Sequence, residues 1–204
     1  MNEAEIRDGF HRVRLTKYHS DPDARVVDEL GLKHGRCRAD IAVINSHLLG
    51  YEIKSDEDTM RRLDRQIGMY NAIFDYATVV VGVKHETEVF SLIPDWWGAI
   101  VCCQDCRTRI SFQTIRAPRL NRGTDLFSIA QLLWRTEAMN ILAEHGVQPS
   151  DLRQTREVLY GHLMDLLSPS DLRRQVRESL KKRPNWRCPA PPSPNGGLCL
   201  PVAK

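Results

Sequence analysis

The chain has 204 residues, of which 42% are hydrophobic and 27% are charged, and its formal net charge is +3. This length allows a sizeable buried core, in one domain with an appendage or in two small domains. The apolar runs are far shorter than a membrane span and the polar start is unlike a signal peptide, so no membrane partner or secretion is expected. Six cysteines without a disulfide framework predict a reduced, cytoplasmic protein.

The first half of the chain predicts helices and strands in alternation. Residues 3–17 carry a weak helical pattern, and residues 20–31 predict a clearer helix with cap-forming residues at its start and a glycine at its end. Two β-rich runs follow at residues 38–45 and 48–55. The two residues between these runs predict a tight hairpin.

The remaining elements are one more helix, three more strands and a helical region. Residues 55–76 predict an amphipathic helix, and the β-branched run at residues 77–83 is typical of a buried strand. A strand pair is predicted at residues 96–103 and 109–115. From Thr124 the pattern is helical throughout, with predicted helices at residues 124–146, 150–168 and 170–182.

This element order predicts an α/β fold with an all-α C-terminal appendage. The predicted division is a first domain at residues 1–118, a helical region at residues 119–183 and a tail at residues 184–204. The tail is rich in proline and glycine and is expected to be disordered.

Charge is distributed unevenly between the two halves. Residues 1–106 carry 13 Lys and Arg against 18 Asp and Glu, a net charge of −5, whereas residues 107–187 carry 15 against 8, a net charge of +7. This asymmetry favours a catalytic or metal-binding part joined to a part that binds a polyanion. The alternative interpretation is that the basic helices only present a solvated surface.

The two strands of the predicted hairpin are largely apolar, yet they carry Asp40, Glu52 and Lys54. Strand alternation directs Glu52 and Lys54 to one face, and pairing of the two strands brings Asp40 beside them. Two adjacent carboxylates repel each other unless a cation lies between them, and oxygen ligands favour Mg²⁺ or Mn²⁺. The alternative is an exposed cluster of ion pairs, which the apolar surroundings of these residues disfavour.

Asp40 and the Glu52-Ile53-Lys54 triplet resemble the D…(D/E)xK signature of the PD-(D/E)XK nuclease superfamily. Residues 40–82 are similar to a poorly characterised bacterial family within it. The resemblance implies a restriction-endonuclease-like αβββαβ core. It also implies that Asp40, Glu52 and the Ile53 carbonyl hold Mg²⁺, and that Lys54 acts on the attacking water.

The resemblance extends to residues outside the triplet. Gln66 and Tyr70 match the QxxxY motif of RecB-like branches, with Arg62 one turn earlier, and Glu29 on the preceding predicted helix corresponds to an additional metal-binding acid. As alternatives, Tyr70 belongs to the core and Glu29 is solvated. Basic residues of the last helix are expected to contact nucleic-acid phosphates: Arg173, Arg174, Arg177 and Lys181.

The predicted function is therefore hydrolysis of DNA phosphodiester bonds by a Mg²⁺- or Mn²⁺-dependent nuclease, in DNA repair or mobile-element defence. Two alternatives remain: a non-catalytic nucleic-acid-binding or regulatory protein on the same fold, and a toxin or effector controlled by a partner. The C-terminal helices are also candidates for homodimer or protein contacts. Cys103 and Cys106 have zinc-ligand spacing, but without a second pair ordinary cysteines are expected.

Overall fold

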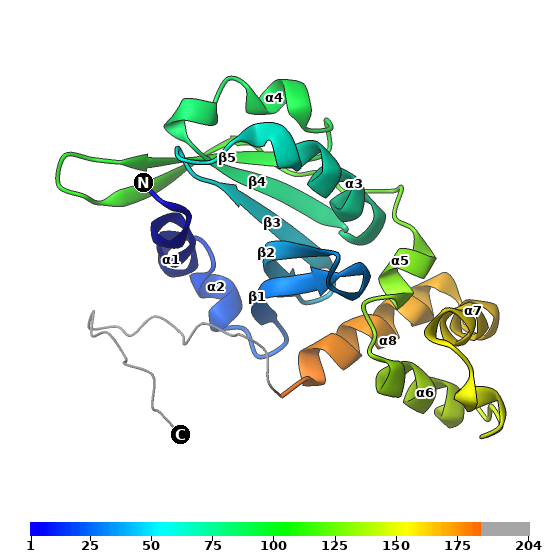
Figure 1. Cartoon of the computed structure of the whole chain (residues 1–204). Helices are drawn as coiled ribbons and strands as arrows, with labels where there is room; N and C mark the ends of the chain where they lie inside the picture. Colours follow the sequence, from blue (N-terminus) through cyan, green and yellow to red (C-terminus); the bar gives the residue numbers. More distant parts are fainter. Residues whose placement is uncertain (185–204) are drawn as a thin grey trace.

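The computed structural model describes residues 1–184 and has one six-stranded sheet at its centre (Figure 1). The strands lie in sequence order; β1, β2 and β3 are antiparallel neighbours, β3, β4 and β5 are parallel, and β6 returns antiparallel to β5. The predicted α/β class is confirmed. The strands are β1 (Arg25–Leu32), β2 (Cys37–Ile44), β3 (Leu48–Lys54), β4 (Tyr76–Gly82), β5 (Gly98–Gln104) and β6 (Ile110–Arg116).

Helices cover both faces of this sheet. On β2, Ile41 and Val43 pack in the cluster of α1 (Glu3–Val13), while Ala42 and Ile44 pack in the cluster of α3 (Leu63–Ile73). The alternation follows from the period of two in a strand, and it explains why β2 is apolar on both faces. The smaller elements are α2 (Thr16–His19), α4 (Val89–Leu92), η1 (Lys33–Gly35), η2 (Met60–Arg62), η3 (Val83–His85) and η4 (Asp151–Arg153).

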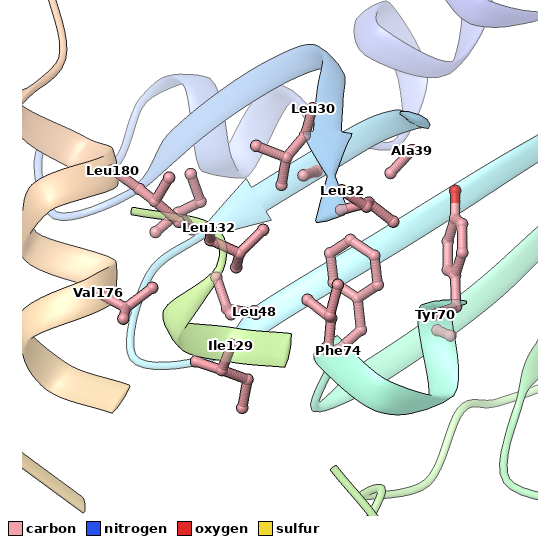
Figure 2. Packing of buried hydrophobic residues seen from close by; sticks show 14 of the residues in the cluster. Leu30, Leu32, Ala39, Leu48, Tyr70, Phe74, Ile129, Leu132, Val176 and Leu180 are labelled. Carbon is pink, nitrogen blue, oxygen red and sulfur yellow. The ribbon is translucent and has the colours of Figure 1, made fainter. Parts of the chain in front are cut away.

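The C-terminal helices pack on the α3 side of the sheet. Ile129 and Leu132 share one hydrophobic cluster with Leu48 of β3 and Phe74 at the end of α3 (Figure 2). The predicted boundary at residue 118 falls in the loop between β6 and the first of these helices, while residues 185–204 of the predicted tail lie outside the described part of the chain. These helices are α5 (Leu126–Ala130), α6 (Arg135–Glu144), α7 (Arg156–Leu166) and α8 (Pro169–Lys182).

The helix predicted at residues 20–31 is wrong, because most of this segment forms strand β1. Val26 and Val27 are β-branched and buried, and the strand pairs with β2 from Arg25 to Leu32. Glu29 has a φ of 56°, which a right-handed helix cannot contain. Pairing with β2 therefore stabilises a strand here, although the residues at the start of the segment suit a helix cap. Three antiparallel strands, β1 to β3, stand where the sequence predicted two.

The single helix predicted at residues 124–146 is also wrong, because it is interrupted between α5 and α6. The carbonyl groups at the interruption accept tertiary hydrogen bonds: Arg183 donates to Leu132 at 2.6 Å and Tyr160 donates to Leu133 at 2.8 Å. These contacts replace the bonds that a continuous helix would form. None of the helices in residues 1–184 is long and apolar enough to cross a membrane.

Other predicted boundaries shift by a few residues. The helix predicted from residue 55 begins only at η2 and α3, because the Asp58 carboxylate accepts hydrogen bonds from the N–H and hydroxyl of Ser55 and closes a turn there. The helix predicted from residue 150 is η4 followed by α7, and the last predicted helix is confirmed as α8.

Candidate active site

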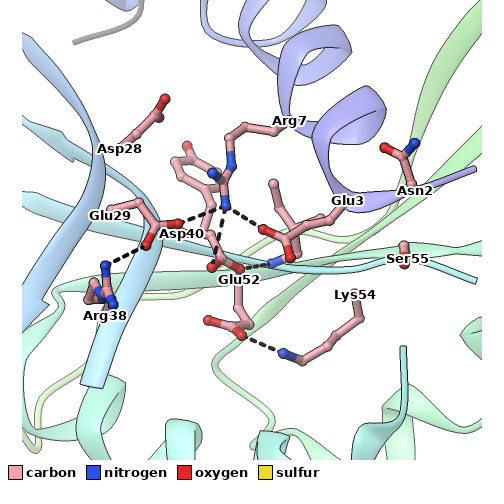
Figure 3. Close-up of polar contacts among 12 residues, drawn as sticks. Asn2, Glu3, Arg7, Asp28, Glu29, Arg38, Asp40, Glu52, Lys54 and Ser55 are labelled. Atoms are coloured by element: carbon pink, nitrogen blue, oxygen red, sulfur yellow. Dashed lines mark hydrogen bonds and ion pairs between the residues drawn. The ribbon is translucent and has the colours of Figure 1, made fainter. Parts of the chain in front are cut away.

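Three acidic residues lie near one another on the three antiparallel strands. Asp28 pairs with Ile41 and Leu30 pairs with Ala39, so Glu29 of β1 stands opposite Asp40 of β2. The printed pairing of β2 with β3 ends at Ile41 and Tyr51, and Glu52 follows on β3 close enough for its charge to act on Asp40. Figure 3 shows Glu29 and Asp40 around Arg7, with the Glu52 carboxylate directed towards Lys54.

Asp40 is fixed by the backbone of the neighbouring strand. Its Oδ2 accepts a hydrogen bond of 2.7 Å from the N–H of Ile53, at the point where the ladder between β2 and β3 has ended. The carboxylate thus satisfies a backbone donor that has lost its strand partner. The predicted role of the Ile53 carbonyl remains a prediction.

Glu52 is fully buried and is held by three donors. Lys54 Nζ donates to its Oε1 at 2.6 Å, the Gln66 amide donates to the same oxygen, and the Tyr70 hydroxyl donates to Oε2 at 2.8 Å. A buried carboxylate needs such partners, because an ion without them is strongly disfavoured. Gln66 and Tyr70 lie four residues apart on α3, so the predicted QxxxY pair meets the predicted acid.

Burial raises the pKa of two acids of this centre, Glu52 and Asp40. Burial raises the pKa of Glu52, an effect opposed by Lys54 and by the hydrogen bonds from Tyr70 and Gln66. Burial, followed by the charge of Glu52, raises the pKa of Asp40 to about 7. Burial and the same carboxylate raise the pKa of Tyr70, which keeps its hydroxyl protonated as a donor.

Sequence reasoning missed Glu3 and Arg7, which α1 brings to the same place. The Arg7 guanidinium contacts Glu3, lies 3.0 Å from Glu29 and lies 3.7 Å from Asp40 (Figure 3). Glu29 is therefore close to the predicted metal ligands, but it reaches them from strand β1 and not from a helix as predicted. The spacing of Glu3 and Arg7 predicts only a helix-surface pair, since their other partners lie far along the chain.

The donor set fits a hard divalent cation. Among residues 1–184, one group has metal-ligand geometry: oxygens of Glu3, Glu29 and Asp40 lie within 4.8 Å of one another. Carboxylate oxygens suit Mg²⁺ and Mn²⁺, and the raised pKa of Asp40 reflects burial and repulsion that such a cation would offset. The Oε1 atom of Gln66 is buried without a hydrogen-bond partner in the described chain, which leaves a free acceptor beside Glu52.

The predicted nucleic-acid contacts fall in two separate places. Arg62 is exposed at the end of η2, next to the helix that carries Gln66 and Tyr70. The basic residues of α8 are not part of the carboxylate centre, because α8 packs against α5. Their contacts are local: Arg173 donates to Thr124 at 2.7 Å, Arg174 pairs with Asp171 at 2.8 Å, Lys181 pairs with Glu178 at 2.7 Å, and burial lowers the pKa of Arg177.

The fold and the site define an α/β protein with a buried carboxylate–lysine centre on the inner strands of a mixed sheet. The chain belongs to the family described as Bacteriophage P4 protein cII, whose model matches residues 2–187. Protein cII of Enterobacteria phage P4 is 29% identical over 163 residues, which are 79% of this chain and 60% of that protein, so the chain spans 60% of its relative's length.

A solved structure is also similar to the chain. It is the SPO1766 protein of unknown function from Silicibacter pomeroyi, which is 14% identical. The match covers 73% of this chain and 97% of that one, with a TM-score of 0.44.

Proposed function

We propose that the protein is a Mg²⁺- or Mn²⁺-dependent nuclease that hydrolyses DNA phosphodiester bonds on a restriction-endonuclease-like fold. The observation that carries the proposal is the group of carboxylates Glu29, Asp40 and Glu52 on adjacent strands, with Lys54 bonded to the last of them. Such a group of carboxylates is costly without a cation and is what a metal-dependent phosphodiesterase needs. The element order α1, β1 to β3, α3, β4 agrees with the αβββαβ core of the PD-(D/E)XK superfamily.

Asp40 and Glu52 would hold the cation, with the Ile53 carbonyl and one oxygen of Glu3 or Glu29. When bound, Mg²⁺ supplies a Lewis acid and lowers the pKa of a water molecule. Lys54 presents an ammonium beside Glu52 that orients the attacking water and offsets negative charge on the phosphate. Gln66 and Tyr70 keep Glu52 oriented through their hydrogen bonds.

The substrate strand is expected to approach the start of α3. Arg61 and Arg62 are exposed there, about one turn before Gln66, and Arg65 is exposed directly before it in the sequence. Exposed arginines beside a carboxylate centre can bind the phosphates that flank the cleaved bond. DNA is the proposed substrate, and a role in DNA repair or mobile-element defence is part of this proposal.

A non-catalytic nucleic-acid-binding protein is the second candidate. The observation that favours it is that Arg7 and Lys54 already pair with the acids that the metal would need. A protein that had lost its metal could keep such internal ion pairs as structural contacts.

Incubation with supercoiled plasmid and with single-stranded DNA, in Mg²⁺, Mn²⁺ or EDTA, tests the proposal. The nuclease is expected to convert plasmid to nicked or linear forms, or to shorten the single strand, with divalent metal and not with EDTA. Retention of both substrates in a gel shift without cleavage in any metal would support the second candidate and contradict the first.

A further inference from the structure

Arg7 contacts carboxylates of β1 and β2 as well as one of its own helix, and the stability of α1 alone does not require the contacts with the strands. Its guanidinium contacts Glu3, lies 3.0 Å from Glu29 and lies 3.7 Å from Asp40, and its side chain is only 22% exposed. The Nε atom is buried without a hydrogen-bond partner in the described part of the chain. The guanidinium donates its hydrogen bonds to Glu3 and Glu29, so its contacts are made with the carboxylates.

Anchoring of α1 to the sheet is the simpler explanation, and it is insufficient. Ile6 and Phe10 are already buried in the cluster of β2 and β3, with exposures of 0% and 1%. The same helix carries Arg12, paired at 2.8 Å with Asp8, and both of these side chains are more than half exposed. Arg12 shows what an ordinary helix-surface pair looks like on α1. Arg7 differs from it by reaching acids of β1 and β2.

The charges around Arg7 indicate that it would compete with a bound divalent cation for the same carboxylates. Glu52 is neutralised by Lys54, so the remaining acids of the centre, Glu3, Glu29 and Asp40, depend on other cations. Arg38 also approaches Glu29, at 3.4 Å, whereas among residues 1–184 Arg7 is the cation within ion-pair distance of Asp40 and Lys54 acts on it only through its charge. A divalent cation held by Asp40 would therefore face a guanidinium within about 4 Å, where two positive charges in a partly buried site repel strongly.

We propose that Arg7 is the internal counter-cation of the carboxylate centre, which a divalent metal ion must displace from Asp40 in order to bind. This inference rests on the proposed function and adds a control step to it. Glu3 lies four residues earlier on α1 and its side chain is 45% exposed, so the pair of Glu3 and Arg7 borders solvent. Arg7 can then leave Asp40 and Glu29 by a change of side-chain conformation, without movement of the helix.

Calorimetric titration of the full chain with Mn²⁺ tests this step without relying on cleavage. Arg7→Gln removes the competing charge and is expected to tighten Mn²⁺ binding about tenfold or more. Arg7→Lys keeps a charge but loses the forked contact with several acids, so its affinity is expected to lie between those of the wild type and Arg7→Gln. Arg12→Gln removes a charge from the same helix and is expected to bind Mn²⁺ like the wild type.

Thermal unfolding supplies the second readout. Without metal, Arg7→Gln is expected to melt below the wild type, because three clustered acids lose a cation, and Mn²⁺ is expected to raise its melting temperature by more than it raises that of the wild type. If Arg7→Gln does not fold without metal, Arg7→Lys decides the question by the same two measurements.

The outcomes separate this inference from the proposed function. Equal or weaker Mn²⁺ affinity in the Arg7 variants, with clear binding by the wild type, would overturn the role of Arg7 and leave the metal site standing. Absence of Mn²⁺ binding in the wild type and in every variant would overturn both. Tighter Mn²⁺ binding by Arg12→Gln as well would show that removing any positive charge from α1 has this effect, and it would also overturn the specific role of Arg7.

Discussion

The hydroxyl of Tyr70 on α3 donates a hydrogen bond of 2.8 Å to Oε2 of Glu52 on β3, and both residues are fully buried. The same hydroxyl lies 3.1 Å from the carbonyl of Tyr51, so one atom joins the helix to the strand beside the candidate catalytic acid. The position of Glu52 therefore depends on the packing of α3 against the sheet.

Tyr70→Phe is expected to lower the free energy of unfolding by about 1–3 kcal/mol, because Glu52 loses a buried donor. It is also expected to weaken Mn²⁺ binding, since the proposed ligand Glu52 is then oriented by one hydrogen bond fewer. Tyr160→Phe is the matched control, because Tyr160 is buried and donates at 2.8 Å to the Leu133 carbonyl away from the acids. Urea unfolding and Mn²⁺ titration check both variants, and equal metal affinity in the two would contradict the orienting role of Tyr70.

Lys54→Met is expected to keep Mn²⁺ binding and to lose most of the cleavage rate, because the ammonium acts on water and phosphate and is not a ligand. Without metal the variant is expected to be less stable by about 3–5 kcal/mol, since the fully buried Glu52 loses its cation. Mn²⁺ should recover much of this loss in a thermal shift assay. A fall in Mn²⁺ affinity as large as that of Asp40→Ala would contradict the role assigned to Lys54.

The pH dependence of stability reports the state of Asp40. Its pKa of about 7 in the folded protein is above the ordinary value of 3.8, so its contribution to stability is fully present in acid below that ordinary value and is lost as pH rises through about 7. Without divalent ions, ionisation of Asp40 as the pH rises from acid to above about 7 is expected to lower the free energy of unfolding of the wild type by up to about 4 kcal/mol. Asp40→Asn should be less sensitive to pH between about pH 5 and pH 8. Urea unfolding at both pH values measures this, and an unchanged pH dependence in Asp40→Asn would contradict the assignment.

Salt dependence of DNA binding separates the two basic surfaces. Replacing Arg61, Arg62 and Arg65 by glutamine is expected to flatten the plot of log affinity against log salt by more than replacing the four basic residues of α8. The reason is that the first three are exposed, whereas Arg174 and Lys181 already pair with acids of their own helix. Removal of one phosphate-binding charge should reduce the slope by about 0.9.

The four α8 replacements are Arg173, Arg174, Arg177 and Lys181 to glutamine. A larger change of slope in this variant than in the α3 variant would place the nucleic acid on the helical region. That result would support the prediction for α8 made from the charge distribution and contradict the approach along α3.

Local patterns predicted those elements whose signal is contained in a few adjacent residues. The hairpin at residues 38–55, the β-branched strand at residues 77–83 and α8 have a clear period of their own, and the structure contains all three. Strand β1 was missed because its short Val26–Val27 run lies between residues that also suit a helix start and end, and only pairing with β2 decides between the two.

The candidate site was predicted in part for the same reason. Strand alternation puts Glu52 and Lys54 on one face of the hairpin, and the spacing of four puts Gln66 and Tyr70 on one face of a helix. That the two sets belong to one site was implied by the resemblance to the PD-(D/E)XK superfamily, and the packing of α3 against β3 brings them into contact. The contacts of Arg7 with Glu29 and Asp40 join α1 to two strands of the sheet, and no local pattern encodes such contacts. The group of acids also depends on β1, which local patterns assigned to a helix.

Cleavage by the wild type and by Glu52→Gln, compared in the same Mg²⁺ and EDTA reactions, tests the central claim most directly. Glutamine keeps the shape of the buried side chain and removes its charge, and circular dichroism and melting without metal confirm that the variant is folded. The account predicts Mg²⁺-dependent cleavage of DNA by the wild type and none above the EDTA background by Glu52→Gln. Cleavage by Glu52→Gln at the wild-type rate, or no cleavage by the wild type in Mg²⁺, would contradict it.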